Sequence, residues 1–171
     1  PLSVSPPRSP NPLNDTFIQA GVECQIPRND DFNGATQEGI GFYELTQDNG
    51  RRCSTAHAYL TPAKNRENLT IFKRSIAEKV MIENGRAIAV RAKIDGRAQI
   101  IRANKEVILS CGAFQSPQLL LLSGIGPKSK LEEHKIDQVL ELPGVGENLT
   151  DHLDYSLIYE SDSEYCLGRN A

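Results

Sequence analysis

The stretch AEKVMIENGRAIAVRAKIDGRAQIIRA, residues 77–103, decides the fold of this sequence. Residues 77–83, 87–94 and 98–103 each predict a strand. The second of them alternates, with Arg91 and Lys93 set between apolar neighbours. A period of two is typical of a strand with one face toward solvent. Asn-Gly and Asp-Gly pairs separate the three runs and supply the left-handed positions of tight hairpin turns. The sequence therefore predicts a three-stranded antiparallel meander.

The next segment changes in character and predicts a different kind of structure. Residues 106–110, EVILS, carry three successive apolar residues, as expected of a parallel strand buried on both faces. Ser116 is predicted to cap a helix whose first residue is Pro117 and which ends at Gly124. A second short helix is predicted over residues 128–135. Strand, glycine turn and helix together predict an α/β fold with α+β elements, the meander included.

Signals before the meander are weaker. A short helix is predicted over residues 16–20, ended by Gly21. Residues 24–50 are polar and rich in turn residues, so we expect loops there. A further helix is predicted over residues 51–60 and a strand over residues 68–72.

Composition excludes several classes of function. The net charge is −3, from 19 basic and 22 acidic residues, which gives no electrostatic reason to expect nucleic acid or an acidic membrane surface. No apolar run is long enough to span a membrane, and the start lacks the pattern of a signal peptide. We therefore expect a cytoplasmic location. The four cysteines show no CxxC spacing, so we expect free, buried thiols and no metal site.

Two features could carry chemistry. Gly112 lies between a predicted strand and a predicted helix, where phosphate or dinucleotide groups are often received. A tight connection within an α/β domain explains the same glycine, and spacing alone favours that explanation. Asp151 and His152 follow a glycine-rich turn, but neighbouring residues of a strand point to opposite faces. Capping and surface hydrogen bonding are therefore the favoured explanation for this pair.

Residues 112–127, GAFQSPQLLLLSGIGP, resemble the second signature of the glucose–methanol–choline (GMC) oxidoreductases. Three other stretches resemble the family in the same order and spacing, and the segments look most like choline dehydrogenase. They are DDFNGATQEGIGF at 30–42, GRRCSTAHAYLTPAKNRENLTI at 50–71, and ELPGVGENLTDHL at 141–153.

The resemblance implies an FAD-binding parallel-sheet domain with a β-meander, and a substrate-binding domain. Residues 1–60 would lie on the substrate side with its connections. Residues 61–136 would supply the meander, a parallel strand and a helix to the FAD domain. Residues 137–171 would return to the substrate domain.

The resemblance also implies a reaction, in which an alcohol is oxidised by hydride transfer to FAD. Carried over by position, Ala77 would meet the adenine, and Ser110, Cys111 and Gly112 would lie along the adenosine and phosphate side. These contacts would be made largely by main-chain atoms. No catalytic residue is expected among these 171, because the family's base lies elsewhere. Choline, another small primary alcohol, a sugar and an aromatic alcohol all stay open as substrates, as does the choice between oxidase and dehydrogenase.

Three motifs of the family have no counterpart in this sequence, namely the amino-terminal GxGxxG, the first signature, and the carboxy-terminal His paired with His or Asn. We therefore expect an internal piece whose amino- and carboxy-terminal parts belong to the same enzyme. Alone, it is expected neither to bind FAD firmly nor to oxidise alcohols. The alternative is a non-catalytic nucleotide-binding or interaction module, or a subunit of a split enzyme.

Overall fold

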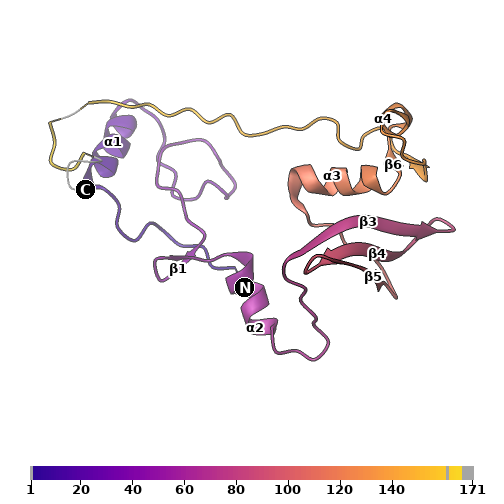
Figure 1. The fold of residues 1–171 in the computed structure, drawn as a ribbon. Helices are drawn as coiled ribbons and strands as arrows, with labels where there is room; N and C mark the ends of the chain where they lie inside the picture. Colours follow the sequence, from indigo (N-terminus) through magenta and orange to yellow (C-terminus); the bar gives the residue numbers. More distant parts are fainter. Residues whose placement is uncertain (1, 161, 167–171) are drawn as a thin grey trace. The chain divides into compact units, whose positions relative to one another are not determined.

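A computed structural model describes residues 2–160 and 162–166, which fall into two compact units (Figure 1). Unit 1 holds the described residues up to 70 together with the described residues from 156 onward. Unit 2 holds residues 71–155. The predicted meander and the signature stretch 112–127 lie in unit 2.

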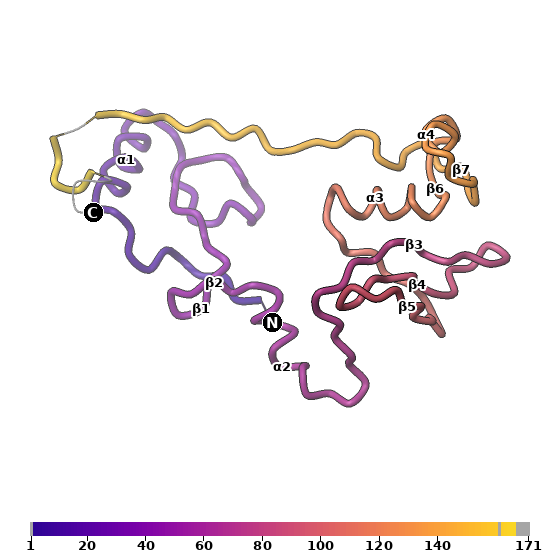
Figure 2. Tube along the Cα trace, viewed as in Figure 1, coloured from indigo at the N-terminus to yellow at the C-terminus, as the bar shows by residue number. Residues whose placement is uncertain are grey.

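The meander of unit 2 forms as predicted. It comprises β3 (Ser75–Glu83), β4 (Arg86–Ile94) and β5 (Arg97–Arg102), paired antiparallel in that order (Figure 2). Both predicted hairpin turns are present, because Asn84, Gly85, Asp95 and Gly96 all adopt positive φ. Each turn therefore has the two left-handed positions that join neighbouring strands tightly.

Burial within β4 follows the predicted alternation. Ala92 and Ile94 are buried, whereas their neighbours Arg91 and Lys93 are exposed. Strand β3 is less regular, because its register against β4 shifts twice, once between Ala77 and Lys79 and once between Met81 and Ile82. Such bulges turn a strand locally and change where its backbone groups point.

Helix α3 (Gly112–Leu122) packs against β3 in unit 2. It begins earlier than predicted: Pro117 lies inside the helix, and Ser116 is not its N-cap. Ser116 instead accepts a hydrogen bond from the Cys111 backbone N at 3.0 Å, so its hydroxyl closes the helix start from within. The predicted end is confirmed, since Gly124 follows the helix with φ 84°.

A short parallel pair follows α3. Strand β6 (Ile125–Gly126) pairs with β7 (Leu140–Glu141), and α4 (Lys128–Glu133) lies between them in sequence. The second predicted helix is thereby confirmed, with an earlier end. The carbonyl of Gly124 accepts hydrogen bonds from the backbone N atoms of Val139 at 2.8 Å and Leu140 at 3.1 Å. These bonds tie the end of α3 to the start of β7.

Residues 106–110 do not form the predicted buried strand. They carry no strand pairing, and Ile108 is 76% exposed. A strand exists only through its hydrogen bonds to a neighbour. No described residue supplies that neighbour, so an apolar run alone does not give a sheet here.

Unit 1 is built from short elements. They are α1 (Pro12–Glu23), the hairpin of β1 (Gln47–Asp48) and β2 (Arg51–Arg52), a π-helical turn at Ala56–Leu60, and α2 (Thr61–Ala63).

Three predictions for unit 1 need correction. Helix α1 is longer than the predicted 16–20 on both sides. The Asn11 side chain caps an earlier start, and the helix continues through Gly21 to Glu23. The predicted helix over 51–60 begins only after β2, whose pairing with β1 takes the first residues of that range. Residues 68–72 form no strand, and no described strand pairs with them. The loops predicted over residues 24–50 are largely confirmed.

The cysteines and the helices bear on two further expectations. Of the four cysteines predicted to be buried, only Cys53 is; Cys24 and Cys111 are exposed, so burial was wrongly predicted for those two, and Cys166 is partly exposed. Among the described residues, none of the helices has the length and apolar character that crossing a membrane requires.

Candidate functional site

The amino-terminal end of α3 leaves backbone open to approach in unit 2. Gly112 is the first helical residue, has φ 89° and is exposed. A Cβ placed on it would meet nothing within 4 Å. The N-cap residue Cys111 makes no side-chain capping bond. The N–H groups of the first turn have no partner within a helix, and the helix dipole favours negative charge at this end. The geometry therefore suits an anionic group such as a phosphate.

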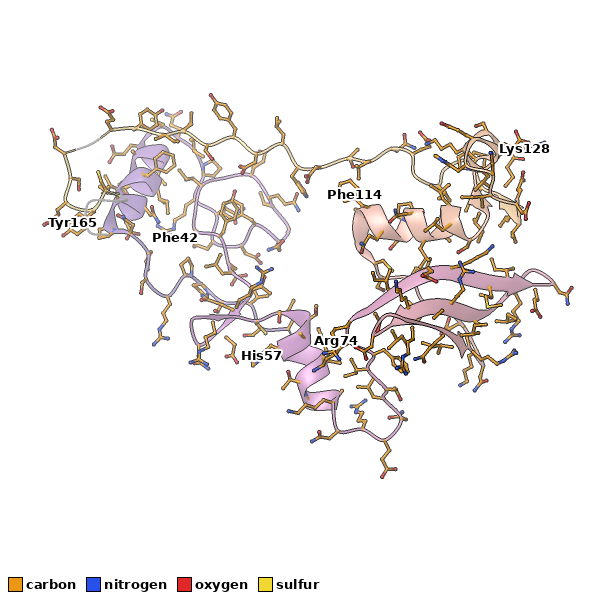
Figure 3. All side chains as sticks on the ribbon, viewed as in Figure 1. Phe42, His57, Arg74, Phe114, Lys128 and Tyr165 are labelled. Atoms are coloured by element: carbon orange, nitrogen blue, oxygen red, sulfur yellow. The ribbon has the colours of Figure 1, made fainter. Side chains whose placement is uncertain are left out.

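A groove of about 690 Å³ runs between α3 and the glycine-rich residues 144–150. Its apolar lining includes Phe114, Pro117, Leu121, Val145 and Leu149. Phe114 is 73% exposed and lies at the start of α3 (Figure 3). Apolar walls beside a helix start can hold a ligand that is part ring and part anion.

Residues 144–150 are linked to α4 through an ion pair. Lys130 Nζ donates to Glu147 Oε1, and both side chains are about half exposed. Within this segment, the side chain of Val145 is buried. The pair contributes less than about 1 kcal/mol to stability at that exposure, so burial of Val145 does more to keep the segment in place.

The four predicted cofactor-contact residues all lie in unit 2 but in two places. Ser110, Cys111 and Gly112 are consecutive and exposed at the start of α3. Ala77 is exposed in β3, where the first register shift begins. None of the four lines the groove, whereas Ala113 and Phe114 directly after them do.

Ser123 was not singled out from the sequence, yet it is the one fully buried polar side chain among the described residues. Its Oγ donates to the carbonyl of Leu119 at 2.6 Å and accepts from the backbone N of Val80 at 2.8 Å. Ser123 thus joins the end of α3 to β3. The only sequence signal that could have indicated the role of Ser123 is its position directly before Gly124, the residue that ends the helix.

Asp151 and His152 form no catalytic arrangement. Both are exposed outside any helix or strand, and the His152 backbone N donates to the Asp151 carboxylate at 2.8 Å. Such a bond between neighbouring residues is local backbone capping. Over residues 2–160 and 162–166, no group of three or more His, Cys, Asp or Glu could hold a metal ion.

The antiparallel meander, the helix packed on it and the open helix start are elements of a mixed α/β protein, and comparison with known proteins specifies the class. The family model described as GMC oxidoreductase matches residues 1–154. The chain therefore belongs to the GMC oxidoreductase family.

Curated relatives agree with this assignment. The chain is 50% identical over 149 residues to the oxygen-dependent choline dehydrogenase of Photobacterium profundum, covering 87% of the chain and 26% of that protein. It is 45% identical over 169 residues to the alcohol dehydrogenase [acceptor] of Pseudomonas putida, covering 98% of the chain and 31% of that protein. The chain thus spans about a quarter to a third of the length of these relatives.

Solved structures confirm the fold class. A pyridoxine 4-oxidase from Mesorbium loti aligns with a TM-score of 0.75 at 31% identity, over 83% of this chain and 28% of that one. An FAD-dependent oxidoreductase from Chaetomium thermophilum aligns with a TM-score of 0.82 at 27% identity, over 88% and 27%. A formate oxidase gives 0.80 at 27% identity, over 89% and 27%. The division of the chain at residues 60 and 136 stays a prediction.

Proposed function

We propose that this chain is part of an FAD-dependent oxidoreductase that oxidises an alcohol, with choline or a similar small primary alcohol as substrate. The observation that carries the proposal is the 50% identity to an oxygen-dependent choline dehydrogenase over 149 residues. The relative described as an alcohol dehydrogenase [acceptor] supports the same type of donor. When bound, FAD supplies the acceptor for the hydride.

The part of this chain in that reaction is to hold the cofactor. Ser110, Cys111 and Gly112 would offer backbone groups at the start of α3 to the adenosine and phosphate side of FAD. The open space over Gly112 supports this role, since a ligand can approach the backbone there without meeting a Cβ. A helix start stabilises a nearby anion by about 0.3–1 kcal/mol at an exposed site.

Ala77 would contribute backbone contacts to the adenine. The register shift after Ala77 supports this, because a bulge leaves backbone groups outside the regular ladder with β4. No side chain among the described residues is proposed as the catalytic base. The residues that abstract the hydroxyl proton would lie in other parts of the same polypeptide.

The test uses the natural polypeptide that carries these residues, purified from its source. We expect it to contain bound FAD, identified by its visible absorption and by release on denaturation. Under anaerobic conditions, choline or another small primary alcohol should bleach that absorption, while a matched tertiary alcohol should not. Bleaching by a sugar or an aromatic alcohol alone would keep the enzyme class and overturn the proposed substrate.

A preparation without flavin, or one whose flavin no alcohol reduces, would overturn the proposal and favour a non-catalytic module. Oxygen uptake then separates the two kinds of acceptor. Uptake at the rate of alcohol oxidation would identify an oxidase, and turnover only with an added artificial acceptor would identify a dehydrogenase.

A further inference from the structure

We infer that Ser123 is a positioning residue for the cofactor site, because it fixes α3 against β3 and thereby holds the two backbone segments that would contact FAD. The inference rests on the proposed function and deepens it. Ser123 would touch no part of the cofactor and would act through the elements that it joins.

The first support is the chemistry of the side chain. A hydroxyl both donates and accepts, and Ser123 uses both capacities, toward Leu119 of the helix and Val80 of the strand. Its complete burial excludes water as a substitute partner. Removing the hydroxyl would leave the Val80 N–H buried without an acceptor, which is far more costly than losing an exposed hydrogen bond.

The second support is the shape of β3. Its two register shifts lie on either side of Val80, between Ala77 and Lys79 and between Met81 and Ile82. Because β3 is an edge strand of the meander, its outward N–H groups face no partner strand among the described residues. The Val80 N–H finds its partner in Ser123 instead, so one side chain attaches the helix to the strand between two bulges.

The third support is that the two elements joined by Ser123 also carry the proposed FAD-contact residues. Val80 is three residues from Ala77 on β3, and Ser123 directly follows α3, whose other end carries Cys111 and Gly112. A helix of 11 residues is rigid over its length of about 16 Å. A shift of α3 against β3 at Ser123 therefore moves the start of the helix relative to Ala77. Binding FAD across both segments requires that this spacing be correct before FAD arrives.

The experiment compares FAD affinity with stability in the natural full-length flavoprotein. Ser123→Ala removes the hydroxyl, Ser123→Thr retains it, and Ser129→Ala serves as control on the exposed face of α4. After removal of the flavin, the Kd for FAD should rise about tenfold in Ser123→Ala and stay unchanged in Ser129→Ala. Ser123→Thr should recover most of the affinity. The turnover rate at saturating FAD should be the same in all four proteins.

A purely structural role would give a different result. A lower unfolding midpoint with unchanged Kd for FAD, measured well below that midpoint, would overturn the inference. A wild-type protein that binds no FAD would overturn the proposed function itself. Loss of turnover at saturating FAD in Ser123→Ala would also contradict a positioning role limited to binding.

A measurement on the wild type covers the case in which Ser123→Ala does not fold. Hydrogen exchange is followed with and without FAD in a β3 peptide from residues 79–83, which contains Val80 and excludes the proposed contact residue Ala77, and in a β5 peptide from residues 97–102. The factor by which FAD slows exchange should be at least three times larger in the β3 peptide than in the β5 peptide. Equal protection of the two peptides would overturn the inference, because the link through Ser123 reaches β3 and not β5.

Discussion

Gly124→Ala should destabilise the protein far more than the same change at Gly85. Both glycines adopt positive φ, 84° and 75° respectively, so each alanine incurs the left-handed cost of about 1–2 kcal/mol. Only at Gly124 does the new Cβ meet other atoms. It would lie 2.4 Å from the carbonyl oxygen of Asp137 and 2.9 Å from Val139 Cγ2. Around Gly85 there is nothing within 4 Å.

The magnitude follows from what must move. The chain after α4 has to withdraw from Gly124, which breaks the hydrogen bonds from Val139 and Leu140 to its carbonyl. Each such bond contributes about 0.5–1.5 kcal/mol net. Together with the left-handed cost, Gly124→Ala should lower the free energy of unfolding by about 2–5 kcal/mol. Gly85→Ala should cost only about 1–2 kcal/mol.

Urea unfolding of the two variants and the wild type measures these losses, and hydrogen exchange in a peptide spanning residues 137–142 localises them. Faster exchange in that peptide is expected for Gly124→Ala alone. Equal losses of stability in the two variants would refute the reasoning. Unchanged exchange in residues 137–142 of Gly124→Ala would refute it as well, since the clash would then be relieved elsewhere.

Three further predictions concern the site and its surroundings. Gly112→Val should raise the Kd for FAD roughly tenfold, which corresponds to about 1.4 kcal/mol. The control Gly85→Val, which has similar left-handed strain and open space, should leave the Kd for FAD unchanged. Flavin titration measures both Kd values. Lys130→Ala should lower the free energy of unfolding by less than about 1 kcal/mol, because its pair with Glu147 is half exposed; a larger loss in urea unfolding would show a stronger role. The 171-residue chain produced alone should elute without flavin and should not oxidise choline. Stable, flavin-loaded material would contradict the expectation that the chain alone does not bind FAD firmly.

The parts of the fold that could be predicted from the sequence are those with local causes. The hairpins of the meander depend on Asn84-Gly85 and Asp95-Gly96, residues that themselves adopt the required backbone conformation. The end of α3 at Gly124 is equally local. Periodicity located β4 because each residue's burial depends on its own place in the pleat.

The parts that failed depend on distant partners or on competing local bonds. Residues 106–110 have the composition of a buried strand, but hydrogen-bonded neighbours decide whether one forms. The start of α3 was misplaced because Ser116 can cap from inside the helix as well as from its boundary. Ser123 could not be found as a link to Val80, because 43 residues separate them and no pattern announces such a bond.

The compact two-residue turns of the meander also bear on the order of events during synthesis. Each hairpin brings together residues that leave the ribosome within moments of each other, and β-hairpins form in about 1–10 μs. Translation adds only about 5–20 residues per second. The meander can therefore fold before α3 has left the ribosome. The edge strand β3 is then already in place when α3 packs against it.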